Sequence, residues 1–185
     1  MTYQAATLGS EVARQNPLEW ASTDSNVASG LIQFISFAID DDQYGVDIMA
    51  VREIKGWSGV THLPKQPEYV RGVLNLRGVM VPIIDLRCRF GQGLTEATPI
   101  HIVIIVQVNA RLVGLLADRV LDIVSIDTAK IQPVPRVAQA SRIDFLSGLV
   151  TIEAGMIALI DLPNLLSMNG SINVNDSKAL TANAA

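Results

Sequence analysis

Residues 72–86 read Gly-Val-Leu-Asn-Leu-Arg-Gly-Val-Met-Val-Pro-Ile-Ile-Asp-Leu, and residues 148–162 read Gly-Leu-Val-Thr-Ile-Glu-Ala-Gly-Met-Ile-Ala-Leu-Ile-Asp-Leu. Gly, Met, Ile, Asp and Leu recur at identical spacing, and most positions between them are apolar in both stretches. A looser repeat relates residues 44–54 to residues 113–123. Two copies of a small strand-rich unit in the same order predict a body with two lobes. Such a body offers a groove between its lobes, which suits a protein that holds partners.

Alternating apolar residues predict short strands around these repeats. In residues 33–39, Ile35, Phe37 and Ile39 point to one face, and an acidic turn at residues 40–43 leads into a second strand. Further strands are expected at residues 73–76, 79–84, 100–108, 111–117, 120–126, 149–152 and 156–160. About ten short strands with short turns indicate a mostly β protein built as a pair of small barrels.

Two local patterns predict departures from regular strands. Ile48, Val51 and Ile54 recur every three residues, which suits a short helical turn better than a strand. Pro82 lacks an N–H group, so its strand is expected to be an edge strand or to be bulged there.

Composition limits the class of protein. The chain has 185 residues, 49% of them hydrophobic, and a net charge of −4 with no block of basic residues. A general nucleic-acid binder would carry a basic stripe, so nucleic acid is not expected as a partner. The N-terminus has no secretory signal pattern, and no apolar stretch reaches membrane-spanning length. A single cysteine, Cys88, fits a reducing compartment, and the expected location is the cytoplasm, without direct membrane insertion.

Polar composition also suggests where the folded domain ends. Residues 1–29 and residues 169–185 have scattered apolar residues and no sustained period. Segments of this kind bury too little apolar area to offset the entropy of ordering. We therefore expect a flexible N-terminal tail (1–29), a domain with two barrel subdomains (30–168) and a flexible C-terminal tail (169–185).

The sequence shows no pattern typical of an enzyme. Its two histidines, His62 and His101, have no second His, Cys or acid at ligand spacing, and no phosphate loop or nucleophile elbow occurs. Asp85 and Asp161 each follow an apolar strand and precede a helix-compatible segment, so both are predicted to be helix caps. No metal or cofactor is expected. A small β-barrel enzyme that uses His62 or His101 remains as a much weaker alternative.

Glu53 and Arg77 stand out as charged residues among apolar neighbours. Arg77 lies at the tip of a tight turn formed with Gly78. An arginine there is either solvated or faces a partner with a carboxylate as its mate, and Glu53 is a candidate for that mate.

Three stretches closely resemble the CheW family of chemotaxis coupling proteins. They are Tyr-Gly-Val-Asp-Ile at 44–48, Val-Arg-Glu-Ile at 51–54, and Gly-Val-Leu-Asn-Leu-Arg-Gly-Val-Met-Val-Pro-Ile-Ile-Asp-Leu-Arg at 72–87. The likeness extends from about residue 31 to residue 166. It implies two five-stranded SH3-like barrels packed side by side, with short helices that include one near the C-terminus.

The resemblance also implies a function and a site. The implied function is a non-catalytic adaptor, recruited to membrane-associated receptor arrays, that links the cytoplasmic tip of chemoreceptors to the regulatory domain of the chemotaxis histidine kinase. A coupling module of a related chemosensory pathway, in surface motility or biofilm formation, is the alternative. The family pattern places four apolar residues in a groove for the receptor tip and makes two charged residues functionally sensitive: Ile48, Val51, Val120 and Ile123, then Glu53 and Arg77. Arg119 and the long N-terminal tail depart from that pattern.

Overall fold

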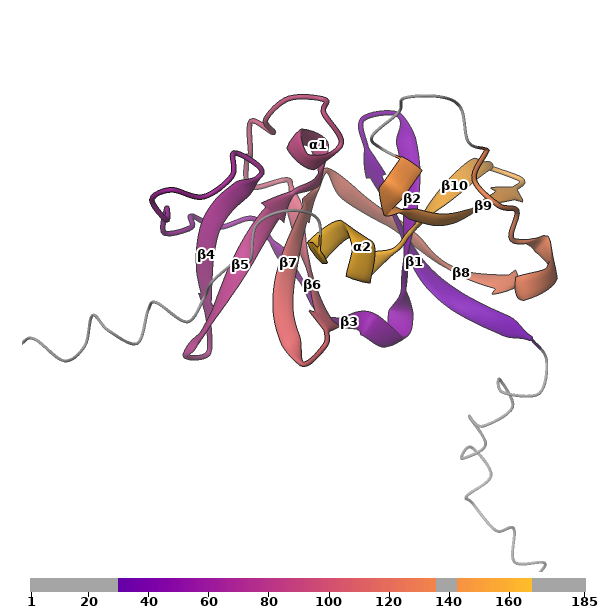
Figure 1. Cartoon of the computed structure of the whole chain (residues 1–185), viewed down its shortest axis with the longest axis horizontal. Coiled ribbons are helices and arrows are strands. Elements are labelled where there is room, and N and C mark those ends of the chain that lie inside the picture. The colour runs from indigo at the N-terminus through magenta and orange to yellow at the C-terminus, as the bar shows by residue number, and fades with distance from the viewer. Residues whose placement is uncertain (1–29, 136–142, 168–185) are drawn as a thin grey trace, which may run out of the picture.

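The computed structural model describes residues 30–135 and 143–167, which form two five-stranded sheets in two lobes (Figure 1). Sheet A consists of β1 (Leu31–Ile39), β2 (Asp42–Asp47), β8 (Arg119–Asp127), β9 (Leu146–Ile152) and β10 (Gly155–Ile160). Sheet B consists of β3 (Val51–Gly56), β4 (Val70–Leu76), β5 (Val79–Asp85), β6 (Ile102–Val108) and β7 (Arg111–Ala117). The mostly β architecture is as the sequence predicted. The expected tails at 1–29 and 169–185 lie outside the described residues.

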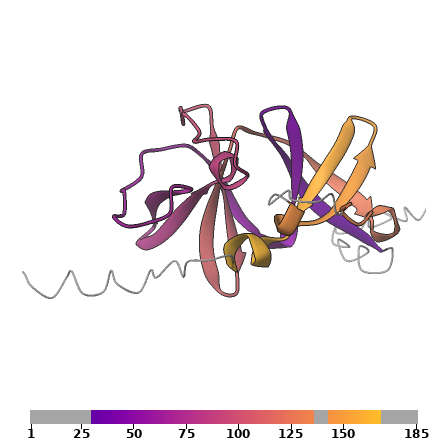
Figure 2. The same ribbon diagram turned by 45° about the horizontal axis from the view of Figure 1, so that its top comes forward.

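Short helical segments complete the described part of the chain. They are α1 (Leu86–Arg89), α2 (Leu162–Ser167) and three 3₁₀ turns, η1 (Ile48–Ala50), η2 (Thr128–Lys130) and η3 (Ile143–Phe145). In both ribbon views the lobes lie side by side, and α2 lies between them (Figure 1, Figure 2). None of the helices in residues 30–135 and 143–167 has the length and apolar character needed to cross a membrane.

The two lobes do not correspond to the two copies seen in the sequence. Sheet A has the order β8-β1-β2-β10-β9 and sheet B the order β3-β6-β7-β5-β4. If each of β1–β5 is exchanged with its counterpart in β6–β10, so that β1 is replaced by β6 and β8 by β3, the strand order of sheet A becomes the strand order of sheet B. Each sheet therefore takes a hairpin from one copy and three strands from the other copy. The parallel pairs agree in detail, since Leu159 faces Gly45 in sheet A and Ile83 faces Gly114 in sheet B.

A β-bulge explains the three-residue spacing that suggested a helical turn at 48–54. Only its first part is helical, in η1, and Val51–Gly56 is a strand, so the prediction is wrong from Val51 onwards. The register of β3 against β6 shifts between Val51 and Glu53. An extra residue in one strand lets positions three apart face the same side. The equivalent strand β8 has its own register shift against β1, opposite Ser36 and Phe37.

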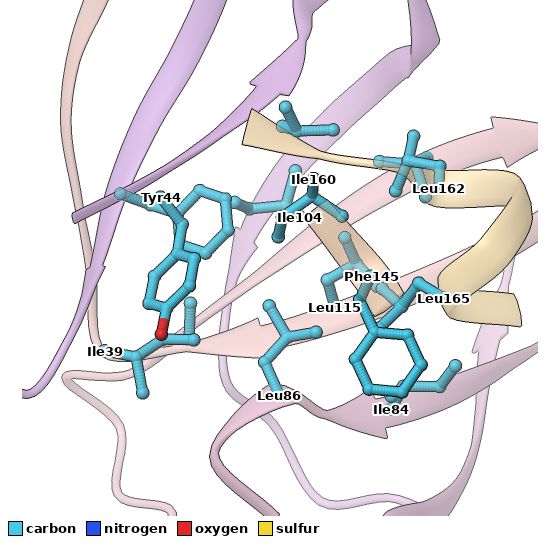
Figure 3. Close-up of a cluster of buried hydrophobic side chains, with 14 of the residues drawn as sticks. Ile39, Tyr44, Ile84, Leu86, Ile104, Leu115, Phe145, Ile160, Leu162 and Leu165 are labelled. Carbon is cyan, nitrogen blue, oxygen red and sulfur yellow. The ribbon is translucent and has the colours of Figure 1, made fainter. Parts of the chain in front are cut away.

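Buried apolar side chains in the described part of the chain form three clusters, and the largest joins the two lobes. The largest, here called the central core, draws buried side chains from both sheets and from α2, including Ile39, Ile104, Leu115 and Leu165 (Figure 3). A second cluster belongs to sheet B and a third to sheet A. As predicted, β1 divides its faces: Ile35, Phe37 and Ile39 enter the central core, and Phe34 enters the sheet A cluster. Because the central core is shared, the lobes pack as one body.

Pro82 is not on an edge strand, because β5 lies between β4 and β7. Pro82 faces Val73 of β4, but Val73 exchanges both of its backbone hydrogen bonds with Thr61 instead. The Pro82 nitrogen therefore points away from β4, and the pairing of β5 with β7 begins only at Ile83. The sheet accommodates the missing N–H where the ladder does not need it.

Asp85 is the N-cap of α1, as predicted, and it also organises a buried network. Its side chain is fully buried. Oδ1 accepts from the Cys88 N–H (3.1 Å) and the Thr95 hydroxyl (2.8 Å), and Oδ2 accepts from the Thr95 N–H (2.9 Å) and from Arg71 Nη1 (3.2 Å). Asp161 caps α2, also as predicted, by accepting from the Asn164 N–H at 3.0 Å.

Candidate partner-binding surface

Strands β3 and β8 are edge strands at equivalent positions in the two sheets. Among the described residues, β3 pairs only with β6 and β8 only with β1. On β8, Val120 faces Phe37 and Ile123 faces Ile35, and both of these β1 residues belong to the central core. Val120 and Ile123 therefore share the side of sheet A that faces the other lobe.

The same arrangement holds on β3. Val51 faces Val106 and Ile54 faces Ile104, and both partners again belong to the central core. Each edge strand thus presents two apolar side chains toward the junction of the lobes. The equivalent bulges are what make this possible.

The apolar side chains near the junction of the lobes differ in how much of each is exposed to solvent. Ile48, Val51 and Val120 are partly buried against the central core. Ile54 is 40% exposed, Ile123 is 53% exposed, and Met49 in η1 is 77% exposed. The structure thus brings three of the four predicted groove residues to one core and places Ile123 on the same face. We call the set the inter-lobe apolar surface: Ile48, Met49, Val51, Ile54, Val120 and Ile123.

Sequence reasoning left two members of this surface out of the site. The repeat of Val51 and Ile54 as Val120 and Ile123 was a signal for Ile54. No pattern pointed to Met49, because its exposure arises from η1, which Asp47 caps by accepting from the Met49 N–H at 2.9 Å.

The two predicted charged residues meet in the structure. Arg77 Nη2 lies 3.2 Å from Glu53 Oε2. The Arg77 side chain is 85% exposed and the Glu53 side chain 25% exposed. One nitrogen of the guanidinium group contacts the carboxylate, so most of the planar fork faces solvent. Because solvent screens the two charges, such an ion pair contributes little to the free energy of unfolding.

Arg77 also occupies a demanding backbone position. It has φ 52° and Gly78 has φ 90° in the two-residue turn between Leu76 and Val79. Positive φ at both central residues defines a type I′ turn, whose first central position favours Asn or Gly. The Asn75 side chain braces the turn by accepting from the Gly78 N–H at 2.8 Å. A long cationic side chain stands where turn chemistry alone would select a different residue.

The two histidines do not form a catalytic arrangement. His62 is exposed between β3 and β4. His101 precedes β6 rather than lying within it, and its Nδ1 accepts from the Thr98 N–H at 3.1 Å, while Nε2 lies 3.7 Å from Asp118 Oδ1. In the part of the chain that the structure describes, no group of three His, Cys, Asp or Glu residues could hold a metal ion.

We expect Cys88 to react slowly with alkylating reagents. Burial raises the pKa of its thiol, and the negative charges of Asp85 and Glu68 raise it further. A raised pKa lowers the thiolate fraction at neutral pH, and the thiolate is the nucleophile. Iodoacetamide should modify native Cys88 more slowly than free cysteine at pH 7.5, and the rate should climb as pH rises beyond the usual thiol range. Urea-unfolded protein is the control, and a native rate above its rate would contradict the prediction.

Two equivalent edge strands carry exposed apolar side chains, and an exposed ion pair lies on one of these strands, a combination typical of surfaces that contact other proteins. Residues 33–169 match the family model described as the CheW-like domain, and the chain belongs to this family. It is 41% identical to the "Chemotaxis protein CheW" of Rhizobium meliloti over 140 residues, which cover 76% of this chain and 90% of that protein. It is 38% identical to the "Chemotaxis protein CheW" of Klebsiella aerogenes, over 73% of this chain and 81% of that protein.

A solved structure shows the same architecture. The scaffolding protein TtCheW from Thermoanaerobacter tengcongensis superposes with a TM-score of 0.69 at 33% identity, over 75% of this chain and 90% of that one. The expected fold of two SH3-like barrels side by side is therefore confirmed.

Proposed function

We propose that this protein is a non-catalytic adaptor that links chemoreceptors to a histidine kinase in bacterial chemotaxis. The observation that carries the proposal is the 41% identity to a protein named for chemotaxis, which covers 76% of this chain and 90% of that protein. The adaptor works in the cytoplasm and is recruited to receptor arrays at the membrane. Its work is to hold two partners in a set relation, and the shared central core suits that task because it fixes one lobe against the other.

The inter-lobe apolar surface is the proposed receptor site. Its apolar side chains come from both lobes, and a helical hairpin tip has an apolar face that such a surface can cover. The packed residues Val51 and Val120 shape the floor, and the exposed residues Ile54 and Ile123 are free to contact a partner. Edge strands that carry exposed apolar groups also risk aggregation, a risk that a partner removes by covering them.

Arg77 and Glu53 are proposed as a polar contact next to this site, since Glu53 faces Ile105 of the sheet B cluster and so lies on the side of β3 opposite Val51 and Ile54. Because an exposed pair contributes little to stability, the arginine is better explained by recognition. Its solvent-facing donors can bind a carboxylate or backbone carbonyls of a partner while Glu53 orients the fork.

The proposal predicts that Ile123→Glu abolishes receptor binding without unfolding the protein. A charge at this exposed position must be desolvated without a counter-charge when the apolar partner binds. The affinity for a purified receptor cytoplasmic fragment should fall by about tenfold or more, as for a binding hot spot. The melting temperature should change little, since the side chain is 53% exposed.

Met156→Glu is the matched control, because Met156 is 56% exposed on β10, away from the inter-lobe apolar surface. It should keep receptor binding. Equal losses in the two variants would remove Ile123 from the receptor site. A pull-down from cells with the wild-type chain tests the wider proposal and identifies which chemosensory pathway supplies the receptors and the kinase. Recovery of neither class of protein would refute it.

A further inference from the structure

An arginine of the short helix α1 connects the two lobes. α1 packs on β5 and β7 of sheet B and lies at the upper side of that lobe in Figure 1, near the turn between β1 and β2. Arg87 Nη1 lies 2.8 Å from Asp40 Oδ2 in that turn of the sheet A lobe. Arg87 Nη2 lies 2.8 Å from Asp118 Oδ2, where the chain passes from β7 to β8. We call these two contacts the Arg87 bridge.

The carboxylates of the Arg87 bridge are themselves held in place. Asp118 Oδ2 also accepts from the Asp40 N–H at 2.7 Å, and the Asp118 N–H donates to the Ala38 carbonyl oxygen at 3.1 Å. The side chains of Arg87 and Asp118 are only 22% and 17% exposed, so solvent screens this pair less than it screens the pair of Arg77 with Glu53. A planar fork with two charge-assisted bonds has a fixed direction, whereas the burial of apolar groups has none. The central core can hold the lobes together, and the Arg87 bridge adds a defined angle.

A second arginine of α1 contacts the sheet A lobe at another point. The guanidinium carbon of Arg89 lies 4.5 Å from the centre of the Phe145 ring, and Nη2 donates to the Leu165 carbonyl oxygen at 3.3 Å. Phe145 directly precedes β9, and Leu165 lies in α2, which follows β10. One point of attachment leaves rotation about that point open, and a second point stops it. The Arg87 bridge is therefore placed to fix the angle that the Arg89 contact leaves open.

The equivalent helix α2 offers no such contacts. The capping residues Asp85 and Asp161 hold equivalent places, so Arg87 corresponds to Pro163, and α2 contains no charged residue. The chain also crosses between the lobes at η1, which joins β2 to β3. Among the residues that the structure describes, no ion pair is found at that crossing. The angle between the lobes thus depends on contacts made at the α1 side.

We propose that the Arg87 bridge fixes the angle between the two lobes and thereby sets the spacing of the apolar side chains that a receptor contacts. Arg87 is a positioning residue, since it lies outside the inter-lobe apolar surface. Ile54 belongs to the sheet B lobe and Ile123 to the sheet A lobe, so a change of angle changes the distance between them. A surface that is already in its binding arrangement loses less entropy on association. The effect on binding rests on the proposed adaptor function, whereas the effect on the angle does not.

Distances between two spin labels on the full chain test the angle. Cys88→Ser provides a background without the native thiol, and Arg111→Cys and Met156→Cys place one label at an exposed position on each lobe. Arg87→Met is then added to remove the bridge. Arg71→Met is the matched control, because it breaks an ion pair of 3.2 Å that lies within the sheet B lobe. Double electron–electron resonance gives the distance distribution of each protein.

We expect the Arg87→Met variant to show a broader distribution, or a mean distance shifted by about 1–2 Å, the size of the slides that packed elements make at interfaces. Arg87→Lys keeps the charge without the fork and should change the distribution in the same sense, which keeps the test decisive if the Met variant does not fold. Arg71→Met should unfold at a lower urea concentration and keep the wild-type distribution. Without labels, the affinity for a purified receptor cytoplasmic fragment should fall several-fold in both Arg87 variants, because fewer molecules hold the binding arrangement. It should stay at the wild-type level in Arg71→Met.

The inference is overturned if both Arg87 variants keep the wild-type distribution, since the apolar core alone would then fix the angle. It is also overturned if Arg71→Met changes the distribution equally, since lost stability would then explain the movement. A changed distribution with unaltered receptor affinity would refute the effect on binding. If the wild type binds no receptor fragment, the proposed function fails, and the distance measurements still decide whether the bridge fixes the angle.

Discussion

We expect the Arg77→Asn variant to unfold at the same urea concentration as the wild type or a higher one, and yet to lose coupling between receptors and kinase. Arg77 adopts φ 52° at a position where Asn is favoured. Relief of this backbone cost offsets the loss of an ion pair whose arginine is 85% exposed. Stability and function should therefore move apart. The measurements are equilibrium unfolding in urea and receptor-controlled kinase activity in a reconstituted array.

Two further variants make this prediction specific. Arg77→Lys keeps the charge but removes the planar fork, so it should also couple poorly. Ala110→Gly relaxes another two-residue turn of sheet B, the one between β6 and β7, where Ala110 has φ 64°, and should raise stability with coupling intact. Normal coupling by the Lys variant would show that charge alone suffices. Normal coupling by both Arg77 variants would remove this residue from the site.

The largest loss of stability is expected for Asp85→Ala. This change removes the acceptor for the Thr95 and Cys88 N–H groups and leaves Arg71, whose side chain is only 24% exposed, without its counter-charge. Breaking one partner of a buried ion pair typically costs about 3–5 kcal/mol. That is a large share of the roughly 5–15 kcal/mol by which a domain is stable. Equilibrium unfolding in urea measures the loss.

Asp161→Ala is the matched control for Asp85→Ala. Asp161 holds the equivalent place before α2 but is not fully buried, and no ion pair is found for it in the described part of the chain. Loss of a helix cap costs about 0.5–2 kcal/mol. Equal losses for the two variants would show that the Arg71 network adds nothing to the cap at Asp85.

Much of the local structure could be predicted from the sequence because it depends on neighbours in the chain. Asp85 and Asp161 cap helices because each precedes a helix-compatible segment, and the alternation in β1 correctly divides Phe34 from Phe37. The sequence left Arg77 either solvated or paired with a carboxylate, and Glu53, the candidate named for that role, does contact it while most of the arginine stays exposed. Their role in binding stays a prediction.

The features that could not be predicted from the sequence depend on contacts with residues far away along the chain. The three-residue spacing at Val51 and Ile54 resembles a helix until the register against β6 reveals a bulge. Pro82 is tolerated inside a sheet because the backbone groups of Val73, which faces it, form their hydrogen bonds with Thr61 instead. The two-residue turn at Arg77 and Gly78 was predicted from the flanking strands, but its type was not, so the positive φ of Arg77 was missed.

The exchange of strands between the two copies has a consequence for synthesis on the ribosome. Sheet B occupies one continuous stretch of chain, from β3 to β7, and all of its strands have been made once residue 117 has emerged. Sheet A is split, because its β1–β2 hairpin is made first and β8, β9 and β10 are made last. The β1–β2 hairpin is synthesised before the whole of sheet B, so its apolar faces lack the other strands of sheet A during that time. Chaperones that bind nascent chains therefore have their longest opportunity at β1 and β2, and the last strand to arrive, β10, completes the sheet by pairing with β2.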